Sequence, residues 1–388
     1  MAKILVLSFS PLHADPRVRR QLTLLAGDHD VTAAGYTDPQ IPGVRFVATI
    51  GPRKSPMQRA LAGVRLQTRR YESYYRDIGQ VAAARQALGG DAYSLVIANE
   101  PDTWPLAHEL RARSGARVLF DAHEFAPREW EDVTSWRWIY QRYREYLCLT
   151  SLPHADAVTT VSDGIADEYA RCFDVRPVVI RNTPPRHDAE PSPVMQDRVR
   201  MIHHGAAIPS RRIETMIRAL DHLDDRFSLD LMLVGNETPY LASLRELADA
   251  RPRVRFRPAV PGDRIPDETQ KYDLGLYVLE PANFNALHAL PNKFFEFIQA
   301  RLGVAIGPSP DMAGLVREFD CGVVAQDFQA ESLASALASL TPESVARFKQ
   351  NAHRAADVLC WERESERLLA LVHRLLAAAP TERVAALQ

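Results

Sequence analysis

The chain has 388 residues, a length that favours two domains of similar size over one continuous core. Hydrophobic residues make up 46% and charged residues 25%, which excludes disordered and fibrous proteins and is typical of a soluble globular protein. The formal net charge of −2 provides no global basic field, so we expect no nucleic-acid partner, and any recognition of phosphate must be local.

The apolar run that begins at Ile4 ends at Ser8, with Pro11 close behind, and is too short for the core of a signal peptide. No stretch approaches the roughly 18 apolar residues of a spanning helix. We therefore expect a cytoplasmic protein. Four widely spaced cysteines form no metal-ligand pattern and are interpreted as reduced thiols. They are Cys148, Cys172, Cys321 and Cys360.

Short β-branched runs alternate with helical patterns along the whole chain. The strands predicted in the first half are 3–7, 30–34, 44–50, 93–99, 117–120, 157–161 and 175–180. Those predicted in the second half are 199–203, 228–234, 254–257, 274–279, 303–306 and 322–325. This alternation predicts an α/β fold with two Rossmann-like domains, each a doubly wound parallel sheet, that face a cleft.

A proline-rich segment that begins at Arg181-Asn182-Thr183-Pro184-Pro185 is the clearest linker signal. We predict a first domain over residues 1–184, a linker over 185–197 and a second domain over 198–361. A final helix, within residues 362–388, has one apolar stripe and is expected to pack back on the first domain.

The most informative segment runs from Leu290 to Pro308. Lys293 and Glu296 are three residues apart, so they share a helix face where a cation can meet a phosphate and a carboxylate can accept ribose hydroxyls. In an arbitrary protein this pair would be a solvated ion pair. After the next strand, the helix start at Met312-Ala313-Gly314 offers backbone N–H groups for an anion or sugar hydroxyls.

This segment resembles the donor-binding signature of the retaining glycosyltransferase family 4: proline, lysine, glutamate, an apolar helix, glycine and a strand. Asp15-Pro16-Arg17-Val18-Arg19-Arg20 resembles that family's first helix start, and Asp121-Ala122-His123-Glu124 its active-site histidine loop. Residues 161–165 and 179–182 resemble the segments that precede its linker. The resemblance implies the GT-B architecture and a nucleotide-sugar donor, either a UDP-sugar or a GDP-sugar. It implies a hydroxyl acceptor, no cofactor, no metal, and retention at the anomeric carbon.

By this resemblance, His123 lies near the reacting sugar and Glu124 adds a second polar contact. A core histidine beside a helix cap is the alternative interpretation. Ser10, His13 and Asp15, which follow the first strand, are predicted on the acceptor side.

The loop after the first strand of the second domain matches the family's diphosphate-binding pattern in part. Gly205 permits close backbone approach, and Arg211 falls where the family has a lysine. Ala206 replaces an arginine that is common in the family, and Arg212 is the expected substitute. A helix start with solvated arginines is the alternative.

The family's first glutamate is replaced by His288, eight residues before Glu296. We therefore predict that His288 or Asn285, in a polar loop, contacts the donor sugar. Gly235 ends a strand where the nucleotide could pass, although turn chemistry alone also explains it.

Two segments bear on the acceptor. Residues 53–76 carry Arg53, Lys54, Arg59, Arg65, Arg69, Arg70 and Arg76. Contact with an anionic acceptor or with the inner face of a membrane is one interpretation, and a solvated helix face is the other. Residues 130–146 are rich in tryptophan and tyrosine, which favours helix packing over sugar stacking.

Asp28-His29-Asp30 imitates a metal-binding motif but lies in a predicted tight turn, so we assign it no metal. The function expected is sugar transfer in the biosynthesis of a glycan, a polysaccharide or a glycosylated natural product. The alternatives are a nucleotide-sugar 2-epimerase of the same architecture and a non-catalytic nucleotide-sugar-binding homologue. The sequence leaves the nucleotide, the acceptor and the oligomeric state open.

Overall fold

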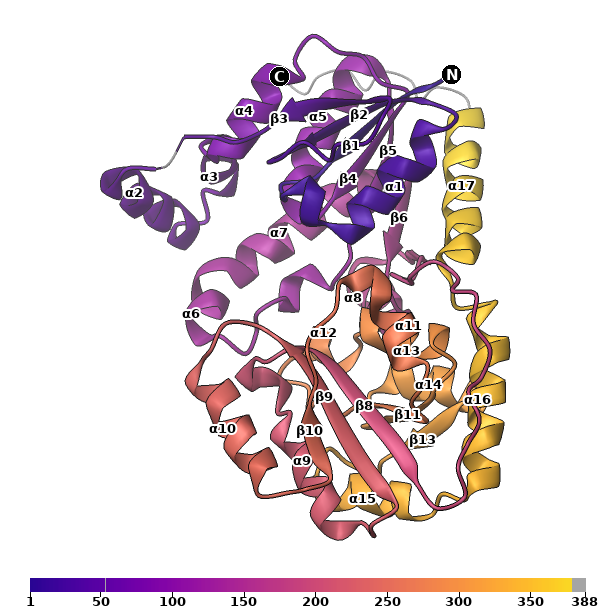
Figure 1. Cartoon of the computed structure of the whole chain (residues 1–388). Coiled ribbons are helices and arrows are strands. Elements are labelled where there is room, and N and C mark those ends of the chain that lie inside the picture. The colour runs from indigo at the N-terminus through magenta and orange to yellow at the C-terminus, as the bar shows by residue number, and fades with distance from the viewer. Residues whose placement is uncertain (53, 379–388) are drawn as a thin grey trace. The chain divides into compact units, whose positions relative to one another are not determined.

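The computed structural model describes residues 1–52 and 54–378, which form two compact units (Figure 1). Unit 1 comprises Met1–Ile180, Asn283–Asn285 and Ser365–Gln388, and unit 2 comprises Arg181–Ala282 and Ala286–Glu364. Arg53 of the predicted basic segment lies outside the described residues.

Unit 1 is built on a seven-stranded parallel sheet with the strand order β3-β2-β1-β4-β5-β6-β7. Its strands are β1 (Lys3–Leu7), β2 (Asp30–Gly35), β3 (Val44–Ala48), β4 (Leu95–Asn99), β5 (Arg117–Asp121), β6 (Ala157–Thr160) and β7 (Val178–Val179). Its helices are α1 (Pro16–Ala26), α2 (Pro56–Gln67), α3 (Tyr71–Arg76), α4 (Gly79–Ala87), α5 (Trp104–Ser114), α6 (Thr134–Trp136), α7 (Arg142–Ser151) and α8 (Asp163–Phe173).

Unit 2 has a six-stranded parallel sheet with the order β10-β9-β8-β11-β12-β13. Its strands are β8 (Val199–Ala206), β9 (Phe227–Val234), β10 (Val254–Phe256), β11 (Leu274–Tyr277), β12 (Gly303–Ile306) and β13 (Gly322–Val324). Its helices are α9 (Glu214–Ala219), α10 (Pro239–Asp249), α11 (Ile265–Thr269), α13 (Asn292–Gln299), α14 (Pro310–Phe319), α15 (Ala330–Ala338) and α16 (Pro342–Ala356). Helix α12 (Phe284–Leu287) is divided between the units, and most of α17 (Trp361–Ala377) belongs to unit 1.

The predicted α/β class with two Rossmann-like sheets is confirmed, because every predicted strand forms and pairs in parallel. The central strands are continuous apolar runs, and β4 is buried along its whole length, as a sheet covered on both faces requires. In each sheet the strand order reverses direction, between β1 and β4 and between β8 and β11. Ligands of doubly wound folds bind beyond the carboxyl ends of the strands at such points.

One local prediction is wrong. Residues 283–288 were expected to form a loop, but Phe284–Leu287 form the short helix α12. The backbone N–H of Phe284 donates to the Glu131 carboxylate, so an acidic side chain binds the start of the helix. This partner is 153 residues away in sequence and gives no local signal.

A buried carboxylate fixes helix α1 to the sheet of unit 1. Asp121 is 1% exposed and accepts hydrogen bonds from Arg17 Nε (2.7 Å) and Arg17 Nη2 (2.6 Å). Gln21 Nε2 (2.5 Å) and Thr159 Oγ1 (2.9 Å) also donate to it. Burial alone would raise the pKa of Asp121, but the charges of Arg17 and His123 hold it well below its ordinary value. Asp121 is therefore a carboxylate that joins α1, β5 and β6.

None of the described helices combines the length and the apolar character that a membrane span needs. The four cysteines are unpaired: Cys172 is exposed, and the other three are buried.

Replacement of Asp121 by asparagine should lower the free energy of unfolding by about 3 to 5 kcal/mol, because it leaves the buried Arg17 guanidinium without its counter-charge. Urea denaturation measures this loss. The matched change Asp167→Asn removes an exposed partner of Arg176 and should leave stability nearly unchanged. A loss of similar size in both variants would contradict the role assigned to Asp121.

Candidate active site

The predicted histidine loop follows β5 at its carboxyl end, where His123 has a left-handed backbone with φ of +35°. Its Nδ1 lies 2.6 Å from Glu100 Oε1. Its Nε2 lies 3.3 Å from both Asp121 Oδ2 and Asn99 Oδ1. Both ring nitrogens therefore face acceptor oxygens, and the side chain is 18% exposed.

These contacts determine the charge of the imidazole. Burial acts to lower the pKa of His123, but the carboxylates of Glu100 and Asp121 outweigh burial and raise the pKa to about 10. His123 is an imidazolium at neutral pH, so it donates hydrogen bonds and does not accept a proton. Glu100 itself has a φ of +67°, and this uncommon backbone directs it toward the histidine.

The other residues predicted in unit 1 have clear local contacts. Glu124 is exposed, and its backbone carbonyl accepts a hydrogen bond from Tyr169 Oη (2.8 Å). Asp15 is the N-cap of α1, where it accepts from the Val18 N–H (3.1 Å) and from Ser10 Oγ (2.9 Å). The interpretation of Asp15 as a helix start is therefore confirmed.

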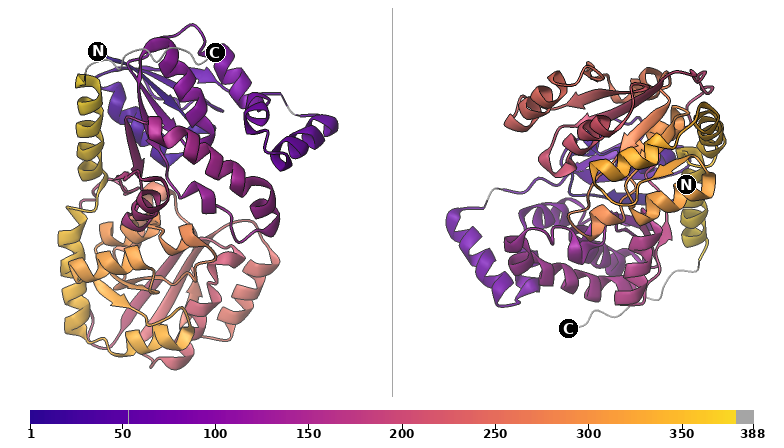
Figure 2. Two further views of the ribbon diagram at one scale, coloured as in Figure 1. Left: turned by 180° about the vertical axis from the view of Figure 1, so that it is seen from behind. Right: turned by 90° about the horizontal axis from the view of Figure 1, so that it is seen from below.

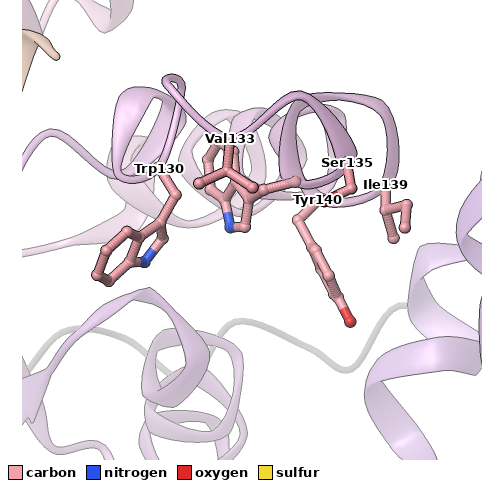
Figure 3. A pocket seen from close by; sticks show the side chains of 6 residues that line it. Trp130, Val133, Ser135, Ile139 and Tyr140 are labelled. Carbon is pink, nitrogen blue, oxygen red and sulfur yellow. The ribbon is translucent and has the colours of Figure 1, made fainter. Parts of the chain in front are cut away.

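His13 and the aromatic segment of unit 1 lie closer to solvent. His13 Nδ1 lies 2.7 Å from Thr37 Oγ1. Trp130 and Trp138 are 53% and 77% exposed, so the prediction that these rings serve helix packing is wrong for both. Trp130, Trp136 and Tyr140 line an open hollow of about 370 Å³, with Trp130 and Tyr140 pointing to the same side (Figure 3).

Unit 2 brings the predicted diphosphate residues together at the end of β8. Gly205 has a φ of +122°, and a Cβ at this position would lie 2.8 Å from Lys293 Nζ and 3.2 Å from Arg211 Nη1. The positive φ favours glycine, and a side chain here would also displace the ends of both cations. Arg211 Nη1 donates to the Ala206 carbonyl (3.0 Å), which fixes its guanidinium over the loop. We call Gly205, Arg211 and Lys293 the cation cradle.

The electrostatics of the cradle favour a bound anion. Lys293 is buried, and burial, followed by the charge of Arg211, lowers its pKa to about 8. His204 is buried beside it with a pKa lowered to about 3 by burial and by both cations, so it is neutral. Glu296 Oε2 lies 3.4 Å from His204 Nε2, on the same helix as Lys293.

The side chain of Arg212 is held by a carboxylate, whereas the backbone of Gly235 is open on one side. Arg212 forms an ion pair with Glu280, so the substitute proposed for the missing arginine is already held by a carboxylate. Gly235 has a φ of +140°, and among the described residues no atom beyond its chain neighbours would lie within 4 Å of a Cβ at this position. The backbone of Gly235 is therefore open on that side.

Fewer backbone N–H groups are free at the start of α14 than the sequence predicted. The N–H of Ala313 donates to the Ser309 carbonyl (2.8 Å), so the expectation of a free N–H there is wrong. Gly314 lies further inside the helix, where N–H groups bond within the helix. Met312, whose side chain is buried, lies in the first turn, where no intrahelical acceptor is available for the N–H. Asp311 also lies in this first turn, and its Oδ2 is 2.7 Å from His288 Nδ1.

Asn285 belongs to unit 1, where both ends of its amide are engaged. Its Oδ1 accepts from the Phe125 N–H (2.8 Å), and its Nδ2 donates to the Phe125 carbonyl (3.2 Å). A contact between Asn285 and the donor sugar, as predicted, would therefore have to replace its hydrogen bonds to the Phe125 backbone, next to the histidine loop.

The sequence interpretation missed the two residues that charge and orient His123 from β4. Asn99 ends β4, and Glu100 follows it at the carboxyl edge, one strand away from His123. The rule that function gathers at strand ends would have pointed to both. Within the described residues, no three histidine, cysteine, aspartate or glutamate side chains gather as metal ligands, and Asp28 lies in a turn with its N–H on the Leu25 carbonyl.

Comparisons with known proteins agree with the fold. Residues 23–184 match Glycosyltransferase Family 4. No curated protein matches the chain by sequence. Sucrose-phosphate synthase from Thermosynechococcus elongatus is similar in structure, with a TM-score of 0.70 and 16% identity over 98% of this chain and 100% of that chain.

Two further solved structures share the fold. HepE of Anabaena, solved with UDP-glucose, has a TM-score of 0.70 and 14% identity over 96% of this chain and 100% of that chain. WaaG, a glycosyltransferase of lipopolysaccharide biosynthesis, has a TM-score of 0.62 and 14% identity over 95% of this chain and 99% of that chain.

Replacement of Glu100 by glutamine should lower the pKa of His123 from about 10 toward its ordinary value of 6.5, because one of its two carboxylates loses its charge. An NMR titration of the His123 ring protons measures this. Since the folded-state pKa is raised, the stabilisation is complete below pH 6.5 and is lost as the pH rises through about 10.

The control Glu109→Gln, whose carboxylate pairs with Arg85, should leave the titration of His123 unchanged. If the wild-type imidazole titrates between pH 6 and 7, the assignment of a resident imidazolium is wrong.

Proposed function

We propose that this family 4-like glycosyltransferase, which has the GT-B fold, transfers a sugar from a nucleotide diphosphate donor to a hydroxyl acceptor. The observation that carries the proposal is the cation cradle: a buried amine and a guanidinium that converge on a glycine with a positive φ. In this proposal the donor diphosphate binds there, and transfer proceeds with retention and without a metal ion.

The cradle suits a diphosphate for a physical reason. Two like charges held against one glycine repel each other. The pKa of Lys293 is lowered by burial and, in second place, by this repulsion from Arg211. A bridging anion would remove the repulsion and form charge-assisted hydrogen bonds with both groups. The neutral His204 adds no further charge, and Glu296 on the same helix is proposed to accept the ribose hydroxyls.

The same residues account for catalysis in this proposal. As the bond between sugar and diphosphate breaks, negative charge grows on the diphosphate, and the fixed cations of Lys293 and Arg211 stabilise it. They supply the charge that a divalent ion supplies in metal-dependent enzymes. Both N–H groups of His123 face protein oxygens, so the imidazolium is proposed to act through its positive charge near the reacting sugar and not as a free donor.

A uridine nucleotide is the first candidate donor, because HepE, which shares the fold, was solved with UDP-glucose. A guanosine nucleotide is the second candidate. The two alternative functions are separated by their products: a 2-epimerase converts the donor alone, and a non-catalytic homologue binds the donor but neither hydrolyses nor transfers it. Mass spectrometry with and without acceptors, followed by NMR of the anomeric configuration, tests transfer and retention together.

We also propose that unit 1 contacts an anionic membrane surface at the cytoplasmic face. Helix α2 stands away from the sheet of unit 1 in all views (Figures 1 and 2). Its apolar residues Met57 and Val64 are 80% and 57% exposed, and they lie among the arginines of the predicted basic segment. Gln67 Nε2 donates to the carbonyl of the exposed Trp138. Exposed apolar and aromatic side chains with cations beside them are typical of interfacial helices.

Lys293→Met should remove most of the stabilisation that UDP or GDP gives, because it removes the buried cation and keeps the volume of the side chain. In the wild type, a ligand at about 100 times its Kd adds about 2.7 kcal/mol of stability, which a thermal-shift assay detects. Glu296→Gln should weaken nucleotide binding and leave the binding of inorganic pyrophosphate unchanged.

The control for this assay is Arg218→Met on α9, an exposed cation outside the cradle. It should retain the full shift with nucleotide. A full shift in Lys293→Met would show that the diphosphate binds elsewhere and would end the proposal.

The double variant Leu61→Glu/Val64→Glu should lose co-sedimentation with vesicles that contain phosphatidylglycerol, because it places two anions on the apolar stripe of α2. Leu149→Glu, at another exposed apolar position of unit 1, should bind vesicles as the wild type does. Equal binding by the wild type and the double variant would refute the membrane contact.

A further inference from the structure

The sheet of unit 2 has an unusual face. Strands of a parallel sheet are normally apolar on both sides because helices cover both faces. Strands β8, β9 and β10, which lie side by side at one edge (Figure 1), instead alternate in their first halves. Met201, Leu229 and Val254 pack in the core. The residues that alternate with them along the strands are charged or polar: Arg200, Ser228, Asp230 and Arg255.

The register gathers these polar residues on one face. Arg200 of β8 is paired with Ser228 of β9, and Asp230 of β9 is paired with Arg255 of β10. They form the floor of a hollow of about 440 Å³. Its lining contains seven cationic side chains and three anionic ones. The cations are Arg198, Arg200, Arg226, Arg253, Arg255, Arg257 and Lys271, and the anions are Asp197, Asp225 and Asp230. We call this hollow the arginine hollow.

Most of these cations are held by the fold. Arg257 Nε donates to Asp230 (2.6 Å), and Arg200 makes two contacts of 3.1 Å with Asp273. Arg253 donates to backbone carbonyls, including that of Leu220 (2.6 Å). These partners fix the walls of the hollow, so a ligand would not have to order them on binding.

Two cations are left for a ligand. Within residues 1–52 and 54–378, the side chains of Arg198 and Arg255 make no ion pair or hydrogen bond, and both are exposed at the hollow. A guanidinium presents paired N–H groups that match the oxygens of a phosphate. Asp273, Asp224 and Glu268 neutralise Arg200, Arg226 and Lys271, so the field that a concave surface concentrates on an anionic ligand comes mainly from Arg198 and Arg255.

From this we infer that the arginine hollow is a second anion site, separate from the cation cradle, that binds a phosphate group. Gly205 of the cradle lies five residues after Arg200 on β8, which is roughly 17 Å along the strand at about 3.3 Å per residue. The hollow therefore lies at the opposite end of the strands from the cradle. The phosphate belongs either to a soluble compound or to an anionic lipid headgroup, and the inference does not depend on the proposed donor.

The test uses inorganic pyrophosphate in isothermal titration calorimetry at low salt. The full chain carries Lys293→Met, so that the cradle does not contribute. We expect binding in this background, and we expect Arg198→Glu/Arg255→Glu to weaken it by at least about tenfold, which corresponds to the loss of two charge-assisted contacts. Both side chains are exposed, so the fold should tolerate the change.

The matched control is Arg218→Glu/Arg347→Glu, which reverses the same number of charges on exposed helical positions of unit 2 outside the hollow. It should retain binding. An equal loss in both double variants would show a general charge effect and overturn the inference.

A parallel co-sedimentation with phosphatidylglycerol vesicles separates the two sources. Binding of pyrophosphate without a hollow-dependent contribution to vesicle binding assigns a soluble phosphate compound. A contribution to vesicle binding that only Arg198→Glu/Arg255→Glu removes, without pyrophosphate binding, assigns a lipid headgroup. If neither probe depends on these two arginines, the hollow is not an anion site.

Discussion

The structure of unit 1 depends on the burial of one negative charge. The Asp121 carboxylate lies at the end of β5, where water cannot solvate it, so the chain must supply donors from other elements. Arg17 and Gln21 of α1 and Thr159 of β6 do so, and His123 is drawn toward the same carboxylate. One interaction therefore sets the position of the first helix and contributes to the charge of His123, the histidine that the sequence predicts to be functional.

The two units use opposite electrostatic arrangements. In unit 1, the acids Glu100 and Asp121 create a cation at His123. In unit 2, Lys293 and Arg211 lie together beside neutral histidines, and the pKa of His203, like that of His204, is lowered by burial and by these cations. In the first arrangement the protein itself supplies the counter-charges of the cation. In the second, the two cations remain available to an anion from outside.

The sequence predicted what local patterns determine. Short apolar runs that alternate with helical patterns identify every strand, and the spacing of Lys293 and Glu296 places both on α13. It did not predict contacts that depend on distant partners. Glu280 pairs with Arg212, the Phe125 backbone binds Asn285, and Glu100 reaches His123 only because β4 and β5 are neighbours. The exposure of Trp138 likewise depends on which surfaces the tertiary fold leaves uncovered.

The return of residues 283–285 to unit 1 matters for attempts to recombine this chain with its relatives. A chimera joined once, between residues 180 and 181, would graft a foreign residue onto the Phe125 backbone where Asn285 now satisfies both the N–H and the carbonyl. It would also exchange Ser365–Gln388, which belong to the first unit although they come last in the sequence. Exchange of one unit between relatives therefore calls for three grafted segments that travel together, and single-crossover hybrids would inherit mismatched contacts.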